Sequence, residues 1–371
     1  MRYTSEWVIC CGRPVVAAGA IGHTSPMNDD YRDDDGDDFG PDDLPESTKH
    51  DHANLSEPIL NELGWELVEE SLAASADLNI RPVRTEVGAT LIDFGCETDG
   101  SLGAGLALAE IASAGLIDLD IETRSLDGMT WPHLRAVTDA PFEACLLSQF
   151  AGWKIRQENY FAIASGPMRA ARGAEEIYQK MAYFESARRA CGVLEADDLP
   201  TDRTLEDIAE ECGVHVRGLG ICVAPVTSLA GSMQVVARSV ETAMHKLHEV
   251  GFDVTQVVSA AGTAPLPPVM PDPIAGIGTT NDAILYGGSV TLWVDAEDDQ
   301  LAELGPKVPS WSSEAAGQPF AEVFEAAGGD FYAIDPLLFS PAEIILHNLA
   351  TGRIHRHGRI DESVVMKSFG L

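Results

Sequence analysis

Arg238 and Glu241 are two residues of this chain whose types and spacing fit acid–base chemistry. They are three positions apart, so on a helix they share one face and their side chains can touch. Arg238 is the first charge after the uncharged stretch 218–237, and the pattern predicts that the helix carrying it starts in the interior. Partial burial raises the pKa of a carboxyl group, and a neighbouring guanidinium lowers it. Glu241 would then be ionised yet basic enough to take a proton from water, although a surface ion pair fits the same spacing.

Three Gly- and Ser-rich stretches form a weaker group of candidates, because each can present backbone amides to an anion. They are residues 164–169, 227–232 and 276–282, and they include Ser165, Gly166 and Asn281. None matches a P-loop or a dinucleotide-binding fingerprint, so each one alone favours a plain turn. Three such stretches in one chain nevertheless indicate a ligand pocket lined by backbone.

The cysteines give no sign of a metal centre or a disulfide framework. There are seven of them, scattered and without a C-x-x-C pair, and no H-E-x-x-H motif is present. We therefore expect no metal, and ordinary buried thiols in a reducing cytoplasm.

The elements that must position Arg238 and Glu241 follow from the spacing of apolar residues. The spacing predicts the longest helix over residues 233–250, with an apolar stripe at 236, 240, 243, 247 and 250. Further helices are predicted over 60–76, 106–114, 141–150, 175–183 and 205–212, and strands over 83–94, 117–123, 221–226, 285–294 and 344–349. Helices and strands interleave irregularly and no repeat appears, so the prediction is an α+β (mixed α/β) fold in two lobes.

Charge and composition divide the chain and exclude some functions. Residues 1–57 hold 13 acidic and 4 basic residues with few apolar ones, which predicts a disordered acidic extension. Residues 58–371 are predicted to form a core of two α+β domains, whose internal boundaries the sequence leaves open. The net charge of −35 argues against nucleic acid and anionic membranes as partners. It fits a salt-adapted host and a GC-rich genome equally well.

Residues 218–237 are uncharged over a length that could span a membrane. Pro225, Gly231 and Gln234 make the stretch too polar for that, so a buried strand, a turn and a helix are the better interpretation. We expect a cytoplasmic protein.

Several blocks of sequence carry a resemblance to a known family. They include Cys-Leu-Leu-Ser-Gln-Phe-Ala-Gly-Trp at 145–153, Ser-Gly-Pro-Met-Arg-Ala at 165–170, Arg-Ser-Val-Glu-Thr-Ala at 238–243, Thr-Asn-Asp at 280–282, Tyr-Gly-Gly-Ser-Val at 286–290, and Phe331-Tyr332 with Ile-Asp-Pro at 334–336. With these blocks in order from about residue 60 to the end, the chain resembles methenyltetrahydromethanopterin cyclohydrolase. The first 57 residues have no counterpart in the resemblance.

The resemblance implies an enzyme of one-carbon metabolism that interconverts N5,N10-methenyltetrahydromethanopterin and N5-formyltetrahydromethanopterin by adding or removing water. It implies no metal or nucleotide cofactor, a homotrimer, and a substrate pocket between two domains. The family's active-site Arg and Glu fall on Arg238 and Glu241. Its other active-site segment falls on Ser148, Gln149 and Phe150, and Phe150 stands where archaeal members can have Lys.

Two alternatives remain open from the sequence. One is a non-catalytic pterin-binding protein in which Arg238 and Glu241 form a structural ion pair. The other is a cyclohydrolase that acts on the folate analogue. Ser148, Gln149, Phe150, Ser165, Gly166 and Asn281 complete the predicted substrate-binding set.

Overall fold

The structure, a computed structural model, describes residues 59–183, 185–328 and 333–371. The predicted extension at residues 1–57 lies outside this range, as do Phe331 and Tyr332. The described residues contain two mixed six-stranded sheets together with many helices, so the predicted α+β class is confirmed. The division into two domains stays a prediction.

The first sheet, sheet A, has three parallel strands at its centre and antiparallel strands at its edges. In spatial order its strands are β1 (Arg81–Val83), β2 (Thr90–Asp93), β8 (Leu219–Ala224), β7 (Ala190–Glu195), β6 (Tyr160–Ser165) and β5 (Trp153–Gln157). Strands β2, β8 and β7 run parallel, so their carboxyl ends share one edge of the sheet. Such an edge is where α/β proteins commonly bind ligands.

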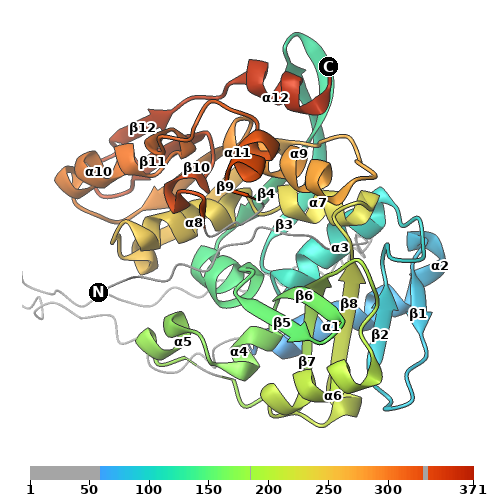
Figure 1. Ribbon diagram of the computed structural model, residues 1–371. Coiled ribbons are helices and arrows are strands. Elements are labelled where there is room, and N and C mark those ends of the chain that lie inside the picture. Colours follow the sequence, from blue (N-terminus) through green and yellow to red (C-terminus); the bar gives the residue numbers. More distant parts are fainter. Residues whose placement is uncertain (1–58, 184, 329–332) are drawn as a thin grey trace, which may run out of the picture. The chain divides into compact units, whose positions relative to one another are not determined.

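Strand β8 is apolar along its whole length because helices cover both faces of sheet A (Figure 1). Leu219, Ile221 and Val223 pack with helix α6 (Asp202–Glu211). The alternate residues Cys222 and Ala224 pack with helices α1 (Leu60–Ala73) and α3 (Leu102–Ala112). Helix α3 is almost entirely apolar, as a helix enclosed in the interior must be.

The second sheet, sheet B, is mostly antiparallel, with one parallel pair, β10 and β11. In spatial order its strands are β12 (Ile354–Gly358), β11 (Glu343–Asn348), β10 (Ser289–Val294), β9 (Val257–Pro265), β4 (Met129–Thr138) and β3 (Asp118–Leu126). Strand β10 alternates between buried and partly exposed residues. Its buried residues Val290, Leu292 and Val294 share a core cluster with helix α8 (Ser239–Glu249). The alternation is the pattern of a strand that buries one face against helices.

The remaining elements connect and cover these sheets (Figure 1). They are α2 (Ser75–Leu78), the π-helix η1 (Phe142–Gln149), α4 (Met168–Arg172), α5 (Glu176–Lys180), α7 (Leu229–Val236), α9 (Pro273–Leu285), α10 (Asp298–Leu304), α11 (Phe320–Ala326) and α12 (Glu362–Phe369), with 3-10 turns at η2 (Val216–Gly218), η3 (Val254–Gln256), η4 (Gly305–Lys307), η5 (Ser310–Ser312) and η7 (Pro336–Leu338). Helices α7, α9, α11 and α12 share one core cluster.

The predicted helix over residues 233–250 is wrong, because two helices occupy this stretch. Helix α7 ends at Val236 and α8 begins at Ser239, with Ala237 and Arg238 forming a turn between them. The Arg238 amide bonds to Val235 O at 3.0 Å, and the Thr242 amide bonds to Arg238 O at 2.9 Å. The turn places Arg238 at the N-cap of α8, with its side chain directed into the interior.

Two other expectations also differ from the structure. The predicted strand over 83–94 is divided into β1 and β2 by a loop in which Gly88 has φ +83°. Residues 276–282 are part of helix α9, which Asp272 caps, and are therefore not a turn. Glycine suits positions 276 and 278 of this helix because Val226 and Ala321 pack closely against them and leave little room for a side chain.

Among the described residues, no helix combines the length and the apolar character needed to cross a bilayer.

Candidate active site

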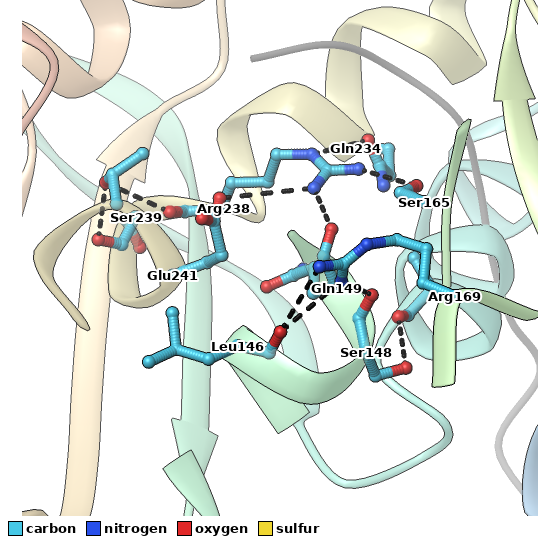
Figure 2. A network of polar contacts seen from close by, with 11 residues as sticks. Leu146, Ser148, Gln149, Ser165, Arg169, Gln234, Arg238, Ser239 and Glu241 are labelled. Carbon is cyan, nitrogen blue, oxygen red and sulfur yellow. Dashed lines mark hydrogen bonds and ion pairs between the residues drawn. The ribbon is translucent and has the colours of Figure 1, made fainter. Parts of the chain in front are cut away.

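Arg238 is the centre of a buried polar network (Figure 2). Its side chain is 0% exposed. Nε donates to Gln234 Oε1 at 3.1 Å, Nη2 donates to Ser165 Oγ at 3.0 Å, and Nη1 donates to the carbonyl oxygen of Gln149. The guanidinium therefore ties together α7, strand β6 of sheet A and the end of the π-helix.

Glu241 lies in the first turn of α8 and points toward the same network (Figure 2). Its Oε2 is 4.0 Å from Arg238 Nη1, and the residue is 2% exposed. Its Oε1 has no hydrogen-bond partner among the described residues. Burial raises the pKa of Glu241 to about 7, while the charges of Arg238 and Arg169 lower it. The sequence prediction that these two residues are neighbours is thus confirmed, in a buried setting.

The π-helix η1 shapes the other side of the network. Phe150 N bonds to Cys145 O at 2.8 Å, which is the wide spacing of a π-helix. Its last carbonyl oxygens accept hydrogen bonds from Arg169, Tyr178, Arg238 and the amide of Gly166. Cationic side chains thus meet the negative end of the helix, where they are stabilising.

Ser148 and Gln149 behave differently within this segment. The Ser148 hydroxyl donates to the carbonyl of Ala112 at 2.7 Å, so it anchors the π-helix to α3. Gln149 is 0% exposed, and neither its Oε1 nor its Nε2 has a hydrogen-bond partner among the described residues. A buried amide without partners is costly, so Gln149 is the group of this segment best placed to bind a polar ligand.

The Phe150 ring contacts one aromatic side chain, His245, and one cationic side chain, Arg169. The ring stacks on His245, with centroids 4.5 Å apart and an interplanar angle of 22°. The Arg169 guanidinium lies 5.0 Å from the same ring centroid. Burial lowers the pKa of His245 well below its ordinary value, which leaves the imidazole neutral. The Phe150 ring is therefore held in one orientation from both sides.

The structure brings Ser165 and Gly166 to the network but gives Asn281 a separate setting. Gly166 has φ +96°, and a Cβ there would lie 3.1 Å from Gly192 Cα, so the close approach requires glycine. Asn281 Nδ2 donates to Ile277 O at 2.8 Å within α9. Its Oδ1 is buried and has no partner among the described residues. A binding role for Asn281 stays a prediction.

Arg169 and Glu195 are charged residues near this network that the sequence pattern did not single out. Arg169 is 0% exposed, donates to Ser148 O at 3.0 Å and pairs with Glu175, to which Nε donates at 2.9 Å. Burial raises the pKa of Glu195 to about 8, and the Arg238 charge lowers it. The sequence offered little signal for either, because arginine and glutamate in a motif are usually exposed.

The fold and the site define an α+β protein with a buried guanidinium–carboxylate pair suited to proton transfer. The family model described as "Cyclohydrolase (MCH)" matches residues 59–369, and the chain belongs to this family. The predicted resemblance is thereby confirmed.

Curated relatives match nearly their full lengths. A methenyltetrahydromethanopterin cyclohydrolase of Rhodopirellula baltica is 46% identical, over 89% of this chain and 98% of the relative. Proteins of the same name from Methylobacillus flagellatus and Methanospirillum hungatei are 40% and 39% identical, each over 84% of this chain and over 96% and 98% of the relative. The family match begins at residue 59, so the first 57 residues lie outside it.

Proposed function

We propose that this chain interconverts N5,N10-methenyltetrahydromethanopterin plus water and N5-formyltetrahydromethanopterin, with Glu241 as the general base. The observation that carries the proposal is the Glu241 carboxyl group, which is 2% exposed and has an unpartnered oxygen among the described residues. It lies 4.0 Å from a fully buried guanidinium. The names of the relatives support the substrate class.

The chemistry needs few groups, because the methenyl carbon is part of an amidinium cation and is already electrophilic. Water forms a C–O bond to this carbon while Glu241 takes one of its protons. The tetrahedral adduct then loses its C–N10 bond, N10 takes up a proton, and the formyl group stays on N5. The balance is one cation and one water converted into a neutral formyl compound and one released proton.

The network supplies the other roles in this proposal. A base with a pKa of about 7 accepts a proton near neutral pH yet is easily ionised again. Arg238 orients the attacking water, or the formyl oxygen in reverse, and its charge favours the ionised form of Glu241. The Gln149 amide supplies hydrogen bonds at the same centre, and Ser148, Phe150, Ser165, Gly166 and Asn281 complete the proposed substrate contacts. Glu241 also places negative charge beside a cationic substrate.

Phe150 stands at a position where the resemblance to archaeal members of the family implies that Lys can occur. An aromatic ring cannot donate a hydrogen bond to the water or the formyl oxygen. In this chain the charges that act on Glu241 come from Arg238 and Arg169. The Arg169 guanidinium lies over the Phe150 ring. We propose that these two arginines provide the positive potential of the site without a cation at position 150.

The assembly and setting that accompany this function are also proposals. They are a homotrimer in the cytoplasm, a pterin pocket between two domains, and catalysis without a resident metal or nucleotide. Sedimentation of the purified protein tests the trimer, and dialysis against a chelator followed by an activity assay tests the metal independence.

The decisive experiment measures the loss of methenyl absorbance when the enzyme is added. Methenyltetrahydromethanopterin and methenyltetrahydrofolate are assayed in parallel, with Glu241→Gln as the matched control. We expect the wild type to hydrate the methanopterin compound with a higher kcat/KM than the folate compound. Binding without loss of absorbance would establish a non-catalytic pterin-binding protein. A preference for the folate compound would establish a cyclohydrolase that acts on the folate analogue.

A further inference from the structure

Glu195 is the last residue of β7, at the edge of sheet A where the parallel strands end. It pairs with Ala224, the last residue of β8, and with Ile163 of β6. Asp93 ends the third parallel strand, β2, at the same edge. Two carboxyl groups therefore stand at the carboxyl edge of sheet A, the part of such sheets that most often receives a ligand.

The carboxyl groups of Asp93 and Glu195 are used differently. Asp93 accepts backbone N–H bonds from Gly95, Cys96 and Glu97, so its carboxylate is consumed in shaping the loop after β2. Glu195 Oε2 is shielded from solvent and has no hydrogen-bond partner among the described residues. A buried acceptor without a hydrogen-bond partner lowers the stability of the folded protein. Its presence therefore favours a role in binding a ligand.

The strand register aims Glu195 at the Arg238 network. Side chains alternate along β7, so Glu195 and Val193 point to the same face of sheet A. Val193 pairs with Ser165, whose hydroxyl accepts from Arg238 Nη2, so Glu195 is diagonal to Ser165 across the two strands. Arg238 is close enough for its charge to lower the pKa of both Glu195 and Glu241.

We propose that Glu195 is the specificity-determining residue that holds the amino-pyrimidine edge of the pterin. This edge presents two adjacent donors, N3–H and the 2-amino group, and an ionised carboxylate accepts both in parallel, so binding near neutral pH is coupled to loss of the Glu195 proton. Such paired, charge-assisted hydrogen bonds combine strength with geometric selectivity. The inference rests on the proposed function, because it assigns the second end of the same substrate.

The arrangement of charges agrees with the shape of a pterin. The carbon that takes up water bridges N5 and N10, whereas the amino-pyrimidine edge is at the other side of the fused ring. Glu241 serves the reacting carbon, Glu195 serves the distant edge, and Arg238 acts on both carboxyl groups. A lumazine has an oxygen at C2 in place of the amino group, so it would set oxygen against oxygen at Glu195.

The test is binding of matched fragments, measured by calorimetry so that it does not depend on turnover. The probes are 6-methyltetrahydropterin and 6-methyltetrahydrolumazine, and the proteins are wild type, Glu195→Gln and the control Asp198→Asn, which removes an exposed charge three residues away. We expect wild type and control to prefer the pterin by about tenfold or more. The Gln variant should lose or reverse the preference, since its amide can donate to the C2 oxygen.

Turnover supplies a second readout, which decides the case where the fragments bind too weakly to measure. In Glu195→Gln, KM for the methenyl substrate should rise about tenfold or more, with kcat changed much less. An unchanged KM in a folded variant, or equal affinity of the wild type for both fragments, overturns the inference. A wild type that prefers the pterin fragment but hydrates nothing contradicts only the proposed function.

Discussion

The Arg238 guanidinium has two effects in the network. It fixes the backbone of Gln149 and the hydroxyl of Ser165, and it lowers the pKa of the two carboxyl groups that we assign to opposite ends of the substrate. Such buried guanidinium groups are useful where geometry matters, because the planar fork holds several acceptors at once.

Replacing Glu241 by Gln should lower turnover by at least about a hundredfold, which is the low end for loss of a general base. The amide is nearly isosteric, so the pocket and the substrate affinity should be retained. Steady-state kinetics with the methenyl substrate measure the change, and circular dichroism confirms the fold. Turnover at the wild-type level in a folded variant would eliminate Glu241 as the base.

As pH rises, Glu241→Gln should become more stable than the wild type. The folded-state pKa of Glu241 is about 7, above its ordinary value of 4.5, so ionising the buried carboxyl costs stability as pH rises through this window. Glutamine carries no such cost, and above pH 7 it should add up to about 3 kcal/mol relative to wild type. In measurements from pH 4 to pH 9, the Tm values of the two proteins should diverge between about pH 4.5 and pH 7 and keep a constant separation above that. The exposed Glu249→Gln on the same helix is the control, and parallel Tm curves would contradict the raised pKa.

Arg238→Gln tests whether the arginine tunes the base. Below about pH 7 the wild-type rate should fall, because Glu241 becomes protonated. Without the guanidinium charge the pKa of Glu241 rises further, so the acid limb of the kcat profile should move to higher pH. Arg238→Lys should restore much of the limb but little of the rate, since an ammonium cannot reproduce the fork. A structural ion pair would instead lower Tm and leave the acid limb unmoved.

At the scale of elements, two irregular pieces of helix build the site. The π-helix η1 presents its last carbonyls to Arg169 and Arg238, and the turn between α7 and α8 turns Arg238 inward. Irregular helices of this kind are often found at functional sites. Each is stabilised by contacts made with other elements.

The sequence predicts the proximity of Arg238 and Glu241 because an i, i+3 spacing depends only on local geometry. It does not predict the turn that precedes them. Residues 237–239 contain neither Gly nor Pro, and the turn accompanies bonds from Arg238 to Gln149 and Ser165, which are distant in sequence. Tertiary contacts override local propensity here.

The difference between the predicted turn at residues 276–282 and the observed helix α9 had a signal in the local sequence. The Asp-Pro pair at 272–273 is a good start signal for helix α9, whereas the prediction of a turn rested on Gly276 and Gly278 alone. Glu195 had none, since a glutamate at the end of an apolar strand has the same appearance whether it faces solvent or a ligand. The sequence therefore predicts the family and the reacting pair more fully than the residues that surround them.

Gly231 tests how strictly α7 is placed. A Cβ at this position would lie 1.8 Å from the carbonyl oxygen of Pro225, so Gly231→Ala must displace α7. We expect a loss of about 1–3 kcal/mol or more in unfolding free energy, together with lower activity per folded molecule. Gly103→Ala in α3 is the matched control, because its Cβ would meet nothing closer than 3.6 Å. That variant should be neutral or gain up to about 1 kcal/mol. Equal denaturation curves for the two variants would contradict the close packing of α7.

At the scale of the whole molecule, acidic charge dominates the surface. The chain has 59 acidic and 24 basic residues, so even complete pairing of the bases would leave 35 acidic residues without a partner. Exposed pairs such as Arg135–Asp120 and Lys367–Glu322 each contribute about 0–1 kcal/mol, and salt weakens them. Salt also weakens the repulsion among the many unpaired carboxylates. The two effects oppose each other, and the excess of acid decides the sign.

We therefore expect salt to stabilise the protein at neutral pH. The screening length falls from about 30 Å at 0.01 M to about 3 Å at 1 M salt, so repulsion between neighbouring carboxylates is largely removed. Tm at pH 7.5 should rise by at least about 2 °C between 0.01 and 1 M KCl. At pH 5, where more carboxyl groups are protonated, the increment should be smaller, whereas a general effect of KCl on hydration would be the same at both values. A flat or falling Tm at pH 7.5 would show that the ion pairs outweigh the repulsion.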